Sequence, residues 1–168
     1  MRILGIDPGI ARTGWGIVEV QSSTLRQRFG QEFKVQSYGC VETPASLPPE
    51  QRLKSIYDSV INIIKEHRLD VLALEELFFN TNAKTAFIVG QARGVVLLAA
   101  SENGLPIAIY TPLQVKIAVT GYGRADKSQI GQMVKAILKL EKIPKPDDVA
   151  DALAVALTHA FSQKMRGL

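Results

Sequence analysis

The chain has 168 residues, of which 46% are hydrophobic and 21% are charged, the proportions of a globular protein. This length fits a single domain, residues 1–168, that can bury a core without a disulfide or a structural metal. Cys40 is the sole cysteine, which excludes a disulfide framework and a cysteine-rich zinc site. No apolar run reaches about 18 residues, and residues 1–7 have the pattern of a strand rather than of a signal peptide. We therefore expect no membrane span and a reducing, cytoplasmic setting.

The positive charge is concentrated in one segment. The formal net charge is +4, and residues 116–145 carry seven basic and two acidic side chains. A basic segment of this kind indicates a polyanionic partner such as a nucleic acid. The alternative is a solvated helix face, because lysines are common on exposed helices.

The first third of the chain predicts three strands. Residues 2–7 form an apolar run that ends in a turn at Pro8 and Gly9. Residues 14–20 predict a second strand, and the alternation over residues 33–41 predicts a third. The short connections favour an antiparallel arrangement of these strands.

The hydrophobic period then changes to that of helices. An apolar stripe over residues 53–64 predicts a helix with Pro48 and Pro49 in its first turn. Residues 71–75 predict a fourth strand. The next helix is capped by Asn82 or Thr81 and runs to about residue 101.

A fifth strand, residues 107–110, precedes three helices. Thr111 and Pro112 cap and start the first of them, which ends before Gly121. Asp126 and Gln129 have the spacing of a capping box, and they precede an apolar stripe over residues 130–138. The last helix begins at Asp148 and reaches about Phe161.

The resulting order, βββαβαβααα, predicts an α/β fold. Strands joined through a helix tend to lie parallel with right-handed crossovers. The first, fourth and fifth strands are then parallel, and the first three strands are antiparallel to one another. We therefore expect a mixed five-stranded sheet covered by helices.

Acidic side chains stand at the ends of two strands that this topology makes neighbours. Asp7 ends the first strand, and Glu75 with Glu76 ends the fourth. In α/β sheets, sites form outside the carboxyl ends of the strands, where the winding changes direction. Asp148 and Asp151 lie on one face of the last helix because they are three residues apart. They could instead complement the helix dipole, although the apolar residues around Asp151 make that explanation weaker for it.

Four carboxylates placed together repel one another unless cations join them. Oxygen ligands without histidine or cysteine suit Mg²⁺ or Mn²⁺. Two such ions, about 3.5–4 Å apart, activate water and stabilise the leaving oxygen in phosphodiester hydrolysis. The acidic set therefore predicts a metal-dependent nuclease, and Glu76 either joins the metal shell or faces away from it.

Several short motifs follow one another along the chain. They are residues 5–9 (GIDPG) with Thr13-Gly14, 74–78 (LEELF), 90–94 (GQARG), 114–116 (QVK), 127–129 (KSQ) and 148–154 (DVADALA). In these motifs and in their order, from residue 2 to about 160, the chain resembles the RuvC-type Holliday-junction resolvases.

The resemblance implies a ribonuclease-H-like sheet with helices on both faces. It also implies a homodimer that makes paired symmetric nicks in four-way DNA junctions during recombination and repair. The partner would be a branch-migration complex of a junction-binding protein and a ring helicase. The residues that match the family's catalytic, Mg²⁺-holding acids are Asp7, Glu75, Asp148 and Asp151.

The same resemblance extends to basic and aromatic residues. Lys116 and Lys127 match residues that serve DNA binding and catalysis, and Phe78 matches an aromatic that contacts a base near the cut. Without the resemblance, surface lysines and a packed phenylalanine are the simpler interpretations. Arg93 is either an ion-pair partner or a DNA contact. The complete set of expected DNA contacts is Phe78, Asn82, Arg93, Lys116, Arg124 and Lys127.

Three alternatives share parts of this pattern. The segment from Asp7 to Gly14 also resembles the phosphate-binding turn of actin-like ATPases, but 168 residues leave no room for their second domain. A nuclease-like family of ribosomal RNA maturation shares the first strand and fits residues 116–129 and 148–154 less well. A junction-binding protein with an inactive nuclease fold predicts losses among the four acids, yet all four are present.

Overall fold

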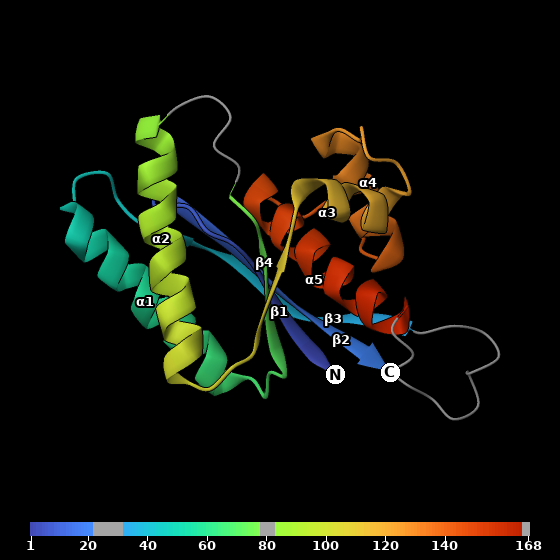
Figure 1. Cartoon of the computed structure of the whole chain (residues 1–168), viewed down its shortest axis with the longest axis horizontal. Coiled ribbons are helices and arrows are strands. Elements are labelled where there is room, and N and C mark those ends of the chain that lie inside the picture. Colours follow the sequence, from blue (N-terminus) through green and yellow to red (C-terminus); the bar gives the residue numbers. More distant parts are fainter. Residues whose placement is uncertain (22–31, 78–82, 166–168) are drawn as a thin grey trace.

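The computed structural model describes residues 1–21, 32–77 and 83–165. Its helices and strands follow the predicted order (Figure 1). The strands are β1 (Arg2–Asp7), β2 (Arg12–Gln21), β3 (Glu32–Glu42), β4 (Val71–Glu75) and β5 (Ile107–Tyr110). The helices are α1 (Pro49–Glu66), α2 (Ala83–Glu102), α3 (Pro112–Thr120), α4 (Lys127–Ile137) and α5 (Asp147–Met165). In the described part of the chain, no helix is long and apolar enough to span a membrane.

The five strands form one mixed sheet in the order β3-β2-β1-β4-β5. The pairs β1/β2 and β2/β3 are antiparallel, and β1/β4 and β4/β5 are parallel. This confirms the predicted topology, including the central pairing of β1 with β4. Because Ile6 pairs with Leu74, the next residues, Asp7 and Glu75, emerge at the same end of adjacent strands.

Helices cover both faces of the sheet, as the resemblance implied. Figure 1 shows α1 and α2 on one side and α3, α4 and α5 on the other. Ile6 and Leu74 belong to the core under α1 and α2. Ile3 and Ala73 belong to the core under the three later helices. Side chains along β1 and β4 thus point to both faces of the sheet and contribute to a hydrophobic core on each face.

Helix α5 lies unusually close to the sheet because glycines face it. A Cβ atom added at Gly5 would lie 2.0 Å from the carbonyl oxygen of Ala152, and one added at Gly14 would lie 2.1 Å from that of Asp148. Any side chain at either position would push the helix outward. This close approach carries the amino end of α5 to the end of β1 where Asp7 lies.

Capping boxes fix the starts of α3 and α4. The Thr111 side chain accepts a hydrogen bond from the Gln114 amide at 3.2 Å, and Asp126 accepts one from Gln129 at 2.8 Å. In both boxes the glutamine side chain also accepts from the backbone of the capping residue. Helix α5 differs slightly from the prediction, since it begins one residue earlier and continues past Phe161 to Met165. The predicted cap of α2, at Thr81 or Asn82, lies outside the described residues.

Candidate active site

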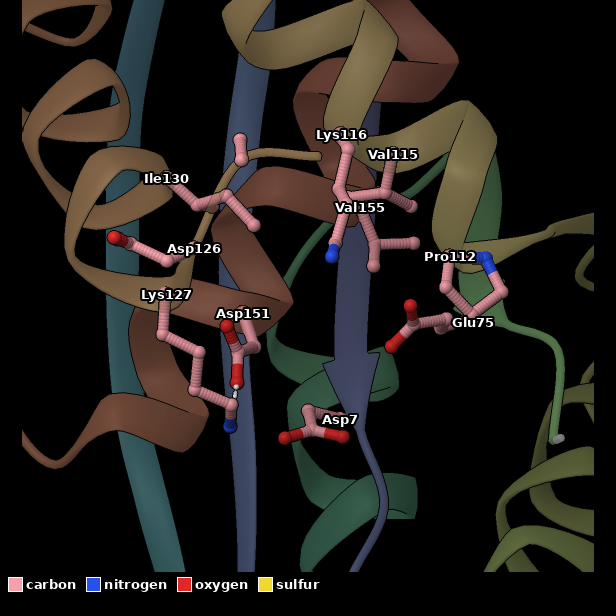
Figure 2. Close-up of a pocket in the computed structure, with 11 residues that line it drawn as sticks. Asp7, Glu75, Pro112, Val115, Lys116, Asp126, Lys127, Ile130, Asp151 and Val155 are labelled. Carbon is pink, nitrogen blue, oxygen red and sulfur yellow. Dashed lines mark hydrogen bonds and ion pairs between the residues drawn. The ribbon is translucent and has the colours of Figure 1, made fainter. Parts of the chain in front are cut away.

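A cleft opens at the carboxyl ends of β1 and β4. Asp7 and Glu75 lie at its base, and its volume is about 440 Å³. Figure 2 shows both carboxylates pointing into this space. Both side chains are partly buried because they end strands whose preceding residues belong to the core. The sheet topology therefore brings together two acids that are far apart in the sequence.

Helix α5 adds two aspartates, which occupy different positions. Asp151 lines the cleft and accepts a hydrogen bond from the Lys127 ammonium at 2.9 Å (Figure 2). Asp148 does not line the cleft itself, and its Oδ2 lies 3.3 Å from Nε of Arg12. That oxygen is buried and has no hydrogen-bond partner within the described part of the chain. The first two turns of α5 thus present Asp151 to the cleft and Asp148 to Arg12.

Burial and mutual repulsion raise the pKa of the central acids. Burial raises the pKa of Asp7 to about 7, and the negative charges of Asp151, Asp148 and Glu75 contribute to the rise. The pKa of Glu75 is raised first by burial and then by Asp151. A group of carboxylates in which the ionised form is disfavoured favours the binding of a cation.

Two lysines approach the acids from the opposite wall. Lys127 lies in the first turn of α4, and Lys116 lies on α3; Figure 2 shows both lining the cleft. The hydrogen bond and charge of Asp151 raise the pKa of Lys127. Both lysines lower the pKa of Glu75, so they lie within electrostatic reach of it. The cleft therefore carries ammonium groups close to where a phosphate would meet the acids.

The donor set suits a hard divalent cation. The four acids offer only oxygen ligands, and Oδ2 of Asp148 is a buried acceptor that pairs with Arg12 but receives no hydrogen bond from the described residues. As the side chains stand, no three His, Cys, Asp or Glu residues in the described ranges are close enough together to hold a metal. The ammonium group of Lys127 forms an ion pair with the carboxylate of Asp151. Holding an ion would therefore require small side-chain movements, beginning with the separation of this pair.

The other expected DNA contacts have different outcomes. Phe78 and Asn82 lie outside the described residues. Arg124 is exposed in the connection between α3 and α4. Arg93 is half-buried, and one of its amino groups donates to the carbonyl oxygen of Glu75. Burial lowers the pKa of Arg93, and the charge of Glu76 opposes this effect.

These contacts bear on two alternatives that the sequence leaves open. Arg93 is bonded to the backbone at the end of β4, which suits a side chain that fixes the position of Glu75. Its contact with DNA stays a prediction. Glu76 is exposed and is absent from the residues that line the cleft. It therefore lies outside the cleft that Asp7, Glu75 and Asp151 line.

Sequence reasoning missed the contribution of Arg12. This residue lies at the start of β2, and its guanidinium pairs with Asp148 at 3.3 Å. The signal was present in the hairpin, since β1 and β2 are joined by a short turn and Asp7 pairs with Gly14. A basic residue two positions before Gly14 must lie near the acidic end of β1. Asp126, which caps α4, also lines the cleft and was predicted only as a cap.

A mixed sheet in this order, with acids at the ends of β1 and β4 and in the first turn of the last helix, defines a nuclease of the ribonuclease-H-like class. Comparison with known proteins identifies the family within that class. The family model of the crossover junction endodeoxyribonuclease RuvC matches residues 3–159, and the chain belongs to this family.

A curated relative and two solved structures agree with this assignment. The crossover junction endodeoxyribonuclease RuvC of Caldicellulosiruptor saccharolyticus is 56% identical over 162 residues, which cover 96% of this chain and 93% of the relative. The Thermus thermophilus RuvC structure has a TM-score of 0.88 and 38% identity, and the match covers 99% of this chain and 97% of that one. The structure of T. thermophilus RuvC in complex with Holliday junction substrate has a TM-score of 0.86 and 36% identity, covering 98% and 96% of the two chains.

Proposed function

We propose that this chain is a crossover junction endodeoxyribonuclease that resolves four-way DNA junctions by paired symmetric nicks. The observation that carries the proposal is the cleft in which Asp7, Glu75 and Asp151 face Lys116 and Lys127. Carboxylates that favour a cation and ammonium groups that favour a phosphate are the two requirements of metal-assisted phosphodiester hydrolysis. Near-full-length membership of the RuvC family supports the four-way junction as substrate.

The proposed cofactor is Mg²⁺, with two ions per site and Mn²⁺ as a substitute. The expected ligands are Asp7, Glu75, Asp148 and Asp151. Bound ions would supply Lewis acidity for the attacking water and the leaving oxygen. The protein contributes the positions of these oxygens, because the β1/β4 register and the close approach of α5 hold the acids beside one another.

Lys127 and Lys116 are the proposed electrostatic partners of the scissile phosphate. Lys127 pairs with Asp151, and 76% of the Lys127 side chain is exposed, against 20% of the Asp151 side chain. Because a mostly buried carboxylate is costly to leave unpaired, Asp151 would need another cation when Lys127 leaves it. Lys127 could then move its ammonium group from Asp151 to a phosphate once the acids hold a metal ion. The remaining proposed DNA contacts are Phe78, Asn82, Arg93 and Arg124.

The proposal includes a homodimer whose interface contains the outer face of α2. Phe87 and Leu98 on this face are 69% and 52% exposed. Apart from the backbone of α2 itself, no described atom lies within 4 Å of a Cβ added at Gly90 or Gly94, so no described element packs closely against the two glycines. Small residues beside exposed apolar ones suit the close packing of two symmetry-related helices. A two-fold dimer would carry two clefts and so account for paired nicks.

Three further assignments belong to the same proposal. Residues 1–168 form one nuclease domain, because both cores pack on a single sheet. The partner of the junction-bound dimer is a branch-migration complex of a junction-binding protein and a ring helicase. The site of action is the cytoplasm, in keeping with the single cysteine of the sequence.

The test is cleavage of an end-labelled synthetic four-way junction in Mg²⁺, compared with a linear duplex of the same sequence. We expect symmetric nicks in the junction alone. The Asp7→Asn variant should still bind the junction but should not cut it. Tight binding without cuts by the parent protein, in Mg²⁺ and in Mn²⁺, would replace the nuclease with a binding module. Preferential cleavage of the duplex or of RNA would reject the proposed substrate.

A further inference from the structure

Helix α3 has an apolar outer face that no part of the core explains. Val115 and Val119 point inward and are 5% and 3% exposed. Leu113 and Ile117 point outward and are 57% and 51% exposed. Tyr122, in the connection that follows, is 55% exposed. Isolated apolar side chains on a surface need no explanation, but a contiguous group suggests a binding surface.

Leu113 and Ile117 contact the chain at Gly123, which Tyr122 precedes and Arg124 follows. A Cβ atom added at Gly123 would lie 2.7 Å from Cδ1 of Leu113 and 3.6 Å from Cγ1 of Ile117. The backbone of the connection thus rests on the outer face of α3, with Tyr122 and Arg124 on either side of the contact. We call Leu113, Ile117, Tyr122 and Arg124 the α3 rim.

The α3 rim borders the catalytic cleft. Pro112 and Lys116 line the cleft and are four residues apart on α3. Leu113 and Ile117 follow each of them by one residue, so their stripe is turned by about 100° around the same helix. Figure 2 shows Pro112 and Lys116 at the cleft wall. A strand whose phosphate reaches Lys116 must therefore pass beside the rim.

The charge around the rim suits a nucleic acid. No acidic residue occurs between Glu102 and Asp126 in the sequence, whereas Lys116 and Arg124 are basic. Aromatic and aliphatic side chains next to cations provide the two contacts that an unpaired nucleotide needs, one for the base and one for the phosphate. A protein partner of the same size would meet no acidic side chain on this helix with which to form ion pairs.

We propose that the α3 rim holds unstacked bases of the DNA strand next to the scissile phosphate, and so positions the strand for the cut. The inference rests on the proposed junction-cleaving function and deepens it. Bases at the crossover of a four-way junction are less constrained by stacking than those of a continuous duplex, so the rim favours junctions over linear DNA. Its residues act as positioning residues, because they contact the strand away from the reacting atoms.

The experiment uses full-length protein and a four-way junction that carries 2-aminopurine beside the crossover. The fluorescence of this base analogue rises when it unstacks and responds to an adjacent aromatic ring. The variants are Tyr122→Ser and the double variant Leu113→Ser with Ile117→Ser. The matched control is Tyr38→Ser, since Tyr38 is 46% exposed and lies on β3, at the opposite edge of the sheet from β5. Binding is measured in Ca²⁺, cleavage in Mg²⁺, and oligomeric state by sedimentation.

We expect the rim variants to lose the fluorescence change of the parent protein and to spread their cuts over neighbouring phosphates. The preference for junction over duplex should fall at least about fivefold, the lower end of the effect of losing one base–aromatic contact. Melting temperature and sedimentation should match those of Tyr38→Ser. The inference is overturned if the rim variants keep the parent's fluorescence and cut position, or if they change sedimentation and leave DNA contacts intact. A parent protein that leaves junctions uncut would instead reject the proposed function.

Discussion

Replacement of Asp7 by asparagine should make the metal-free protein more stable at neutral pH. Burial and the neighbouring acids raise the pKa of Asp7 from 3.8 to about 7. Asparagine has nearly the same shape as aspartate and carries no charge. Asp7→Asn therefore removes the free-energy cost of burying a carboxylate and its repulsion by the neighbouring acids. The variant tests directly whether the acids are packed against one another in the folded chain.

The magnitude follows from linkage between protonation and folding. A pKa that is higher in the folded protein makes the free energy of unfolding fall as the pH rises from about 4 to about 7, after which it stays low. At about 1.36 kcal/mol per pH unit, the penalty from Asp7 is about 4 kcal/mol at pH 8. It falls to about 1.6 kcal/mol at pH 5 and below 1 kcal/mol at about pH 4. The gain of Asp7→Asn over the parent should follow the same curve.

The measurement is urea unfolding of both proteins in EDTA at several pH values, repeated in Mg²⁺. The control is Asp58→Asn, which removes an exposed acid paired with Lys54 and should change stability by no more than about 0.5 kcal/mol at any pH. In Mg²⁺ the parent should recover most of the difference, because a bound cation compensates the repulsion. A gain that is absent at pH 8, or equal at pH 4 and pH 8, would refute the proposed packing of the acids.

Three other substitutions test separate parts of the structure. Gly5→Ala forces a methyl group against a backbone carbonyl of α5 and should cost about 3 kcal/mol or more in urea unfolding, and an unchanged free energy of unfolding would contradict the close packing of α5 on β1. Asp126→Ala removes the cap of α4 and should lower the free energy of unfolding by about 1 kcal/mol, with a larger loss contradicting a simple capping role. Lys127→Gln should slow junction cleavage at least about tenfold in single-turnover assays, and equal rates would exclude Lys127 from the reaction. The same variant should lower the free energy of unfolding of the metal-free protein at neutral pH, because it leaves the mostly buried Asp151 without its ion pair.

The sheet and its acidic edge could be predicted because both depend on chain connectivity. Strands joined through a helix tend to be parallel, and short connections favour antiparallel pairing of the first three strands. Together these rules predict that β1 and β4 run in the same direction, and their pairing in the sheet brings the ends that carry Asp7 and Glu75 side by side. The caps at Thr111 and Asp126 could be predicted because the capping-box contacts span only three residues. Local spacing and topology thus account for the frame of the site.

The details that depend on helix rotation could not be predicted. The sequence places Asp148 and Asp151 on one face of α5, yet only Asp151 reaches the cleft, because the packing of α5 against β1 and β2 decides which side chain points where. Arg93 is an example of the same limit. Its bond to the Glu75 carbonyl joins α2 to the end of β4, and no short-range pattern indicates which strand a helix side chain will meet.

The close packing of α5 links the stability of the fold to the properties of the site. Gly5 and Gly14 allow α5 to lie against the sheet, and this approach brings Asp148 and Asp151 near Asp7. The same contact that completes the core therefore produces the repulsion that raises the pKa of Asp7. Lys127 relieves part of it, because its charge lowers the pKa of Asp7 while it pairs with Asp151. A cation that replaced this ammonium group would stabilise the fold and release Lys127 for a phosphate in the same step, so metal binding and substrate binding should reinforce each other.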